Sequence, residues 1–329
     1  MRILELAIFL CAAPAACMVT APAFAQGGSD DYPAKLVTIT VPFDAGSSHD
    51  SMLRPYLQSI FESTGKRFQL VFRPGAGTTL GTAVVARSAA DGYTILSVSP
   101  AIAITPSVYP DLPYDNIKDF APISLLSKQA FLLVVNSSMP YKNVAEYIAY
   151  AKAHPGELNW SSSGAGSATH LPGEFLHYLT KTKVTFVHYK TGSQRLIDLM
   201  AGRVHVSMAS FPNAMEHIKA GRMRALAVTT NKRVPDWPEM PTIEEQGVPG
   251  YDFSSWLGLL APARTPQAII DKLYGWFLSA SKDPNVSKPK ADGNILVGST
   301  PEELRQHLVR ETEQWRKLIR ETGMKVEGR

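Results

Sequence analysis

Two segments of the sequence place small and hydroxylated residues between a strand-like run and a helical pattern. The first covers residues 42–50 (PFDAGSSHD) and the second covers residues 161–170 (SSSGAGSATH). Ligands of open α/β sheets bind outside the carboxyl ends of the strands, where free N–H groups at a helix start attract anions. Either segment alone is also compatible with a capped turn or a flexible loop. As a pair, they predict two anion-binding helix starts that face each other across a cleft.

The energies of such a site are sufficient for a small anion. Ser47 or Ser48 can cap the first helix, and the small neighbours let the backbone approach a ligand. A hydrogen bond to a charged group contributes about 1.5–3 kcal/mol, and a helix terminus adds roughly 0.3–2 kcal/mol. Four such bonds and two helix termini reach the roughly 8 kcal/mol of micromolar binding, before ordering costs are subtracted. The site therefore requires no Arg or Lys.

Other chemistry has weaker support in the sequence. Residues 75–81 (GAGTTLG) resemble a dinucleotide fingerprint, but the last glycine stands one position too far along. No nucleophile elbow or zinc-protease motif occurs. Ser167 and His170, three residues apart, leave an exported hydrolase as the rival hypothesis. We expect no catalytic residue, cofactor or metal site, and we interpret four histidines as helix-surface residues: His154, His177, His217 and His307.

Strand-like and helical patterns alternate along the chain and predict an α/β fold. β-branched runs at residues 36–41, 68–72 and 93–96 enclose helical patterns at 52–61 and 80–88, an order typical of a parallel sheet with helices on both faces. The alternation restarts with strands at 131–135, 158–160, 184–187, 204–207 and 224–228 and helices at 144–153, 168–179, 195–201 and 214–220. A capping box at Thr300 opens a C-terminal helix. With no linker between two such lobes, we expect a hinge made of strands that cross between them.

The first 25 residues have the pattern of a secretory signal peptide. Arg2 precedes an apolar run, and residues 23–25 (AFA) form a cleavage site, so we expect export to the periplasm of a Gram-negative bacterium. The run is short and Pro14 interrupts it, which argues against a membrane anchor. A lipoprotein anchor at Cys17 is a weaker alternative, because Pro14 stands where a lipobox has Leu. Both cysteines, Cys11 and Cys17, lie in this segment. The mature chain therefore has no disulfide, thiol nucleophile or Cys-bound metal.

Length and charge restrict the remaining possibilities. Removal of 25 of the 329 residues leaves 304, a length typical of about two domains. The net charge of +4 is spread along the chain rather than concentrated in a basic patch. We therefore expect no nucleic-acid partner, whereas a small anion suits this balance.

The chain resembles the Bug proteins, the Bordetella uptake gene products that are similar to TctC. These proteins are extracytoplasmic receptors of tripartite tricarboxylate transporters. Besides residues 42–50, the matches lie at 32–35 (YPAK), 73–77 (RPGAG), 91–94 (DGYT), 112–115 (LPYD), 118–122 (KDFAP), 167–171 (SATHL), 189–190 (YK), 217–221 (HIKAG), 224–228 (RALAV), 241–243 (PTI) and 256–262 (WLGLLAP). So many ordered matches are specific for the family, although not for one ligand.

The resemblance implies a type II periplasmic-binding fold of two Rossmann-like lobes that close on a ligand. Residues 26–127 with 252–329 would form the first lobe and residues 128–251 the second. Family members hold a carboxylate between the two loops, largely by backbone amides, hydroxyls and water. Carried over to this chain, the ligand contacts are Phe43, Ala45, Gly46, Ser47, Ser48, His49 and Asp50 in the first loop, Gly164, Ser167, Thr169 and His170 in the second, and Tyr189 lining the cleft.

Four positions depart from the family pattern. Ser47 stands where a second Gly is usual, His49 where Thr is usual and His188 where Pro is usual. An Asp is common at about Ala209, where it could face the ammonium group of an amino-acid ligand. Its absence argues against an amino acid, and these positions are where we expect ligand choice to be determined. Pro55 also falls inside the first helix and removes one of its hydrogen bonds.

These observations predict a monomeric periplasmic receptor for a small organic acid. Its partners would be the large and small membrane subunits of a transporter, or a sensor kinase if it acts only in signalling. The sequence does not separate uptake from signalling, and it does not identify the acid.

Overall fold

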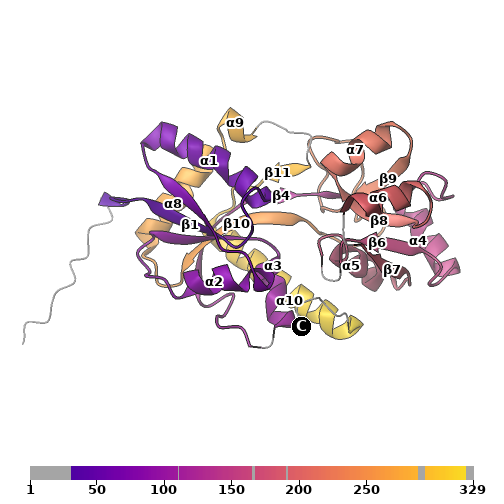
Figure 1. Cartoon of the computed structure of the whole chain (residues 1–329), viewed down its shortest axis with the longest axis horizontal. Helices are drawn as coiled ribbons and strands as arrows, with labels where there is room; N and C mark the ends of the chain where they lie inside the picture. Colours follow the sequence, from indigo (N-terminus) through magenta and orange to yellow (C-terminus); the bar gives the residue numbers. More distant parts are fainter. Residues whose placement is uncertain (1–30, 110, 165–166, 190–191, 288–292, 324–329) are drawn as a thin grey trace, which may run out of the picture.

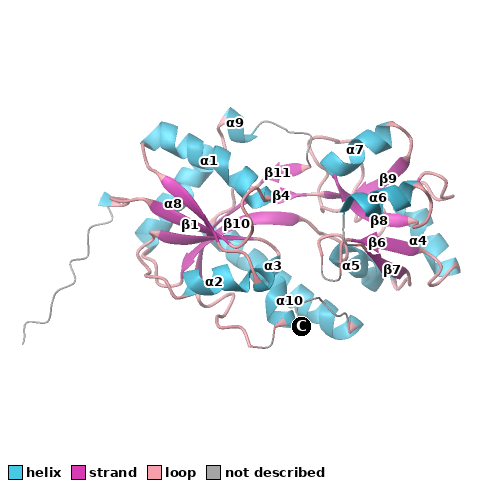
Figure 2. Cartoon of the chain, in the orientation of Figure 1, coloured by secondary structure: helices cyan, strands magenta, loops and turns pink. Residues whose placement is uncertain are grey.

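The structure is a computed structural model that describes residues 31–109, 111–164, 167–189, 192–287 and 293–323. Its strands form two sheets that lie side by side, each covered by helices (Figures 1 and 2). The expected signal peptide, with its cleavage site and both cysteines, lies outside the described residues. None of the helices in the described ranges is long and apolar enough to cross a membrane.

The first sheet has six strands in the order β11-β4-β10-β3-β1-β2. β1 (Val37–Val41) pairs in parallel with β2 (Phe68–Phe72) and β3 (Thr94–Val98), which confirms the predicted parallel arrangement of these three strands. The sheet then continues through antiparallel strands: β10 (Ser255–Pro262), β4 (Phe120–Gln129) and β11 (Asn294–Leu296). The carboxyl ends of β1, β2 and β3 therefore meet at one edge.

Helices cover both faces of the first sheet, as predicted. The helices α1 (Ser48–Thr64) and α8 (Gln267–Ala280) pack their apolar side chains on one face. The short turn η2 (Ala76–Thr78) leads into α2 (Thr79–Ala86), which covers the other face with α3 (Ala101–Val108) and α10 (Pro301–Thr322). The short α9 (Pro284–Ser287) follows α8. α1 continues through Pro55, which sits inside the helix.

The second sheet has five strands in the order β7-β6-β8-β5-β9. Its strands are β5 (Phe131–Asn136), β6 (Asn159–Ser162), β7 (Thr185–His188), β8 (Val206–Ser210) and β9 (Met223–Val228). β6 is parallel to β7 and to the central β8, whereas β5 is antiparallel to its neighbours. Helices α4 (Val144–Ala153) and α5 (Leu171–Thr180) cover one face, and α6 (Gly192–Met200) and α7 (Phe211–Lys219) cover the other.

The chain crosses between the sheets on adjacent extended segments. β4 ends in the first sheet at Gln129, and β5 begins in the second at Phe131. The return segment is held to this crossing because Thr229 N donates to Phe131 O (3.0 Å) and Phe253 N donates to Thr229 O (2.9 Å). This is the expected arrangement of crossing strands.

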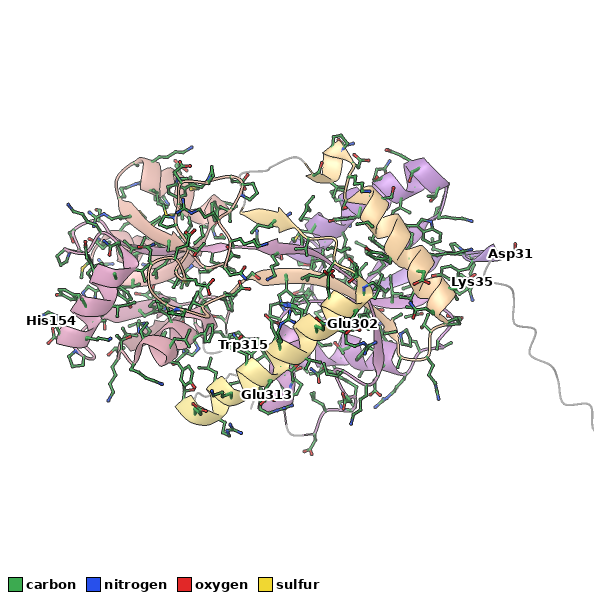
Figure 3. The ribbon with its side chains drawn as sticks, turned by 180° about the vertical axis from the view of Figure 1, so that it is seen from behind. Asp31, Lys35, His154, Glu302, Glu313 and Trp315 are labelled. Atoms are coloured by element: carbon green, nitrogen blue, oxygen red, sulfur yellow. The ribbon has the colours of Figure 1, made fainter. Side chains whose placement is uncertain are left out.

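A third connection is made by α10. The capping box predicted at Thr300 is present, with Glu303 as its partner, and the helix begins beneath the first sheet. Its later turns reach the core of the second sheet, where the Trp315 ring lies 6.2 Å from Phe175 and 6.0 Å from Phe253 between centroids. Figure 3 shows the helix from behind, with Glu302 near its start and Trp315 toward the second sheet.

One of the four histidines interpreted as helix-surface residues, His177, is buried, so that interpretation was wrong for it. His177 is enclosed on α5, where it bonds Thr182 Oγ1 (2.6 Å) and Tyr147 Oη (3.2 Å). His307 packs against the Trp256 ring, 5.2 Å between centroids. Burial lowers the pKa of His177 to about 3. Polar partners explain how an uncharged imidazole occupies the core. His154, His217 and His307 are half-buried.

Candidate functional site

The first loop is a tight turn held by the first turn of α1. Ser47 N donates to Asp44 O (3.2 Å), and Gly46 takes a left-handed φ of 79° that favours glycine. The buried Asp50 carboxylate accepts from Gly46 N (2.9 Å) and contacts Arg54 Nε (2.7 Å). Burial opposes ionisation of Asp50, but the hydrogen bonds from Gly46 and Arg54 outweigh it and keep its pKa below the usual range. Asp50 therefore fixes the loop as a carboxylate.

The N-terminus of α1 is not closed by a side-chain cap. Ser47 occupies the N-cap position with extended backbone, but its side chain makes no capping hydrogen bond. Its Oγ is buried, and no described residue bonds it. The first intrahelical bond runs from Ser51 N to Ser47 O (3.1 Å), so the N–H groups of Ser48 and His49 precede the ladder. The anticipated cap is absent, which leaves these donors for another acceptor.

His49 lies at the inner side of this helix start. Its side chain is 4 % exposed, its Nδ1 lies 2.9 Å from Ser97 Oγ, and its ring packs on Phe43 at 4.4 Å between centroids. Burial lowers the pKa of His49 to about 4. The imidazole is therefore neutral at physiological pH.

The second loop is organised around the Thr169 hydroxyl. Thr169 Oγ1 accepts from Ser163 N (2.9 Å) and lies 2.9 Å from Ser163 Oγ and 3.1 Å from Ser167 Oγ. Trp160 Nε1 donates to Thr169 O (3.0 Å) and ties the loop to the core. The helix α5 begins at Leu171, three residues later than predicted, because Pro172 occupies the first helical turn.

The two loops line one cavity of about 420 Å³. Phe43, Ser48 and His49 come from the first loop, and Ser163, Gly164 and Ser167 come from the second. The volume is suited to a small organic molecule. Residues that follow parallel strands of both sheets thus converge on one space.

The remaining residues predicted for the site have other positions. Six of them flank the lining residues in the two loops without lining the cavity themselves: Ala45, Gly46, Ser47, Asp50, Thr169 and His170. Tyr189 donates its hydroxyl to Asp198 Oδ2 (2.9 Å), and Ala209 is fully buried in the core beside α7. His188 bonds Ser162 Oγ through Nδ1 (2.6 Å).

Several cavity residues were missed by sequence reasoning. Gly77, Ser99 and Pro100 follow β2 and β3, while Tyr109 follows α3. Ligands bind beyond the carboxyl ends of strands, and this holds for β2 and β3 as it does for β1 and β6. Phe253 and Ser255 arrive on the returning crossing segment. A local pattern carries no information about that long-range placement.

A larger hollow, of about 1010 Å³, lies on the outer side of α1 and β2. It is bordered by Arg54, Phe61 and Arg67 and includes none of the predicted contact residues. The smaller cavity is the candidate site because both loops meet there.

The geometry offers little support for hydrolysis at this site. Ser167 Oγ pairs with Thr169 Oγ1, whereas the His170 ring approaches Glu174 Oε1 at 3.2 Å. Among the described residues, no group of three His, Cys, Asp or Glu side chains is arranged to hold a metal ion.

A two-lobed fold with a cavity between its sheets is typical of solute-binding receptors. Residues 60–324 match the family model described as tripartite tricarboxylate transporter family receptor, and the chain belongs to this family. BugT of Bordetella pertussis is 33 % identical over 312 residues, which cover 94 % of this chain and 96 % of BugT. The resemblance inferred from the sequence motifs is thereby confirmed.

Solved structures agree with the fold and the family. An R. palustris protein solved with adipate is 34 % identical, with a TM-score of 0.71 over 89 % of this chain and 99 % of its own. MatC from Rhodopseudomonas palustris, with bound malate, is 28 % identical, with a TM-score of 0.67 over 88 % and 100 % of the two chains. The periplasmic binding protein BugD is 29 % identical, with a TM-score of 0.68 over 89 % and 99 %. The type II periplasmic-binding fold is thus established for this chain.

Proposed function

We propose that this receptor binds a small organic acid in the 420 Å³ cavity, with a carboxylate held between the two loops. The observation that carries the proposal is that Ser48 and His49, which follow β1, and Gly164 and Ser167, which follow β6, line a single cavity. The uncapped start of α1 supplies N–H donors. The adipate and malate in two relatives are in line with an acid as ligand.

The lobes close on the acid by a hinge at the crossing strands. We assign residues 26–127 and 252–329 to one lobe and residues 128–251 to the other, with pivots near Ala130 and Ser254. The loop residues that do not line the cavity, including Asp50 and Thr169, act by shaping the backbone that does. Tyr189 and Ala209 would contribute only if closure brought them nearer. This is a receptor without enzymatic activity.

Membership of the family supports the biological setting that we propose. The chain loses residues 1–25 on export to the periplasm, works as a monomer, and delivers the acid to the large and small membrane subunits of a tripartite tricarboxylate transporter.

Thermal denaturation of purified residues 26–329 against a panel of organic acids tests the proposal. Binding to the folded state by a ligand at 100 times its Kd stabilises that state by about 2.7 kcal/mol, which raises the melting temperature by several degrees. Each acid is paired with its neutral amide as a control. If the acids have no more effect than their amides across the panel, the protein is not a carboxylate receptor.

A further inference from the structure

The described lining of the cavity carries no permanently charged side chain. It consists of hydroxylated, small, apolar and aromatic residues together with His49, and it includes no Lys, Arg, Asp or Glu. A carboxylate held at the helix starts is balanced by backbone dipoles. A second carboxylate in the same ligand would have no cation within the described lining to offset its loss of water.

His49 supplies one neutral polar group to this lining. Its Nδ1 is engaged by Ser97 Oγ, and no described residue hydrogen-bonds its Nε2. With 4 % exposure the side chain is held in place, and it borders the cavity. Because the ring is uncharged, it can exchange a hydrogen bond with a ligand but cannot neutralise an anion.

The rest of the wall offers a surface for an apolar group. Ile104 and Val108 on α3 line the cavity together with Leu171 on α5 and Phe253. Three of these four side chains belong to the buried core that joins α3 to the second sheet, and Val108 packs against it. An alkyl or aromatic body placed here gains from burial, whereas an ionised group loses its hydration.

From the uncharged lining and the apolar wall, we infer that the cavity selects acids with a single carboxylate and an apolar body over dicarboxylates and tricarboxylates. This inference rests on the proposed function and adds the ligand class. It separates this receptor from the relatives solved with adipate and malate, which are dicarboxylates.

Calorimetry with hexanoate and adipate provides the test, because the two acids share a six-carbon chain and differ in the second carboxylate. We expect hexanoate to bind at least about tenfold more tightly, which is about 1.4 kcal/mol. If adipate binds as tightly as hexanoate or more tightly, the inference is overturned while the carboxylate receptor stands. If neither these nor other acids bind, the proposed function itself fails.

A positive charge placed in the wall should weaken the selection for a single carboxylate. Val108→Lys adds an ammonium group at the cavity, so the ratio of adipate to hexanoate affinity should rise about tenfold. Val309→Lys is the matched control. Val309 lies on α10 and is 48 % exposed, so a lysine there should leave the ratio unchanged. If Val108→Lys does not fold, Ser255→Lys on β10 carries the same test. An unchanged ratio in a folded variant with the added lysine contradicts the inference.

Discussion

The two loops that meet at the cavity are fastened by different kinds of hydrogen bond. In the first loop, the ionised Asp50 accepts a hydrogen bond from Gly46 N, and the buried His49 ring bonds Ser97 Oγ and so fixes the start of α1. In the second, neutral hydroxyls gather around Thr169. Hydrogen bonds to ionised groups are roughly twice as strong as neutral ones. We therefore expect the first loop to be the more rigid and the second to adapt to the ligand.

The loops also differ in what supports them. Arg54, the partner of Asp50, is 66 % exposed, so solvent screens much of that ion pair and the bond from Gly46 carries more of the effect. The second loop rests on the buried Trp160, whose indole N–H holds the Thr169 carbonyl. Packing, rather than charge, thus sets the position of the second loop.

The largest effect should follow from removal of the Asp50 carboxylate, which holds the first loop. Asp50→Ala leaves Gly46 N without its acceptor and should lower the free energy of unfolding by about 1.5–3 kcal/mol, measured by urea denaturation. Asp50→Asn keeps an oxygen acceptor and should lose less. Equal stability of the wild type and Asp50→Ala would show that the carboxylate does not hold this loop.

Crowding beneath the second loop should have a somewhat smaller effect. A Cβ at Gly173 would lie 2.6 Å from Trp160 Cε2, so Gly173→Ala should displace the indole and cost about 1–3 kcal/mol of unfolding free energy. Gly275→Ala on α8 is the control, since its Cβ meets nothing within 4 Å, and it should be neutral or stabilising by about 0.5–1 kcal/mol. Matching melting curves for the two variants would refute the role of packing here.

The hydroxyl centre of the second loop can be removed without much change of shape. Thr169→Val deletes the acceptor for Ser163 N and should cost about 1 kcal/mol of stability and reduce ligand affinity in calorimetry. Ser167→Ala removes only one of the neighbouring hydroxyls and should have a smaller effect on stability. Wild-type stability and affinity in Thr169→Val would mean that the loop keeps its shape without the hydroxyl cluster.

The last effect is absent at neutral pH and appears only on acidification. Burial lowers the pKa of His49 to about 4. Between pH 6.5 and 4 the unfolded chain therefore binds a proton on this imidazole that the folded chain does not bind. Stability should therefore fall as pH drops from 6.5 to 4, and His49→Asn should remove that part of the fall. Ligand affinity should stay constant from pH 6 to 8, because neither His49 nor the carboxylate of the ligand titrates there. A change of affinity in that window that is lost in His49→Asn would contradict a neutral His49 in the free receptor.

The fold was predictable where its determinants are local. The start of α10 can be read from four consecutive residues, because the capping box runs from Thr300 to Glu303. By contrast, α3 escaped prediction because its sequence (AIAITPSV) is nearly all apolar and contains Pro106, so no helical periodicity stands out. Its helical form depends on the packing of Ile102 on the first sheet and Ile104 on the core of the second.

The candidate site was predictable to a similar degree. Phe43, Ser48, His49, Gly164 and Ser167 line the cavity because each follows a strand whose carboxyl end could be read from the sequence. The apolar wall could not be read in this way. It is assembled from α3, α5 and the returning segment, which are far apart in the chain and meet only through tertiary packing.

A crystal structure of the mature chain with a bound acid would show whether both loops hold the carboxylate. We expect a carboxylate within hydrogen-bond distance of backbone N–H groups or hydroxyls of both loops, including Ser48 or His49 on one side and Ser167 on the other. A carboxylate bound to one loop alone, or in the outer hollow beside Phe61, would contradict this expectation.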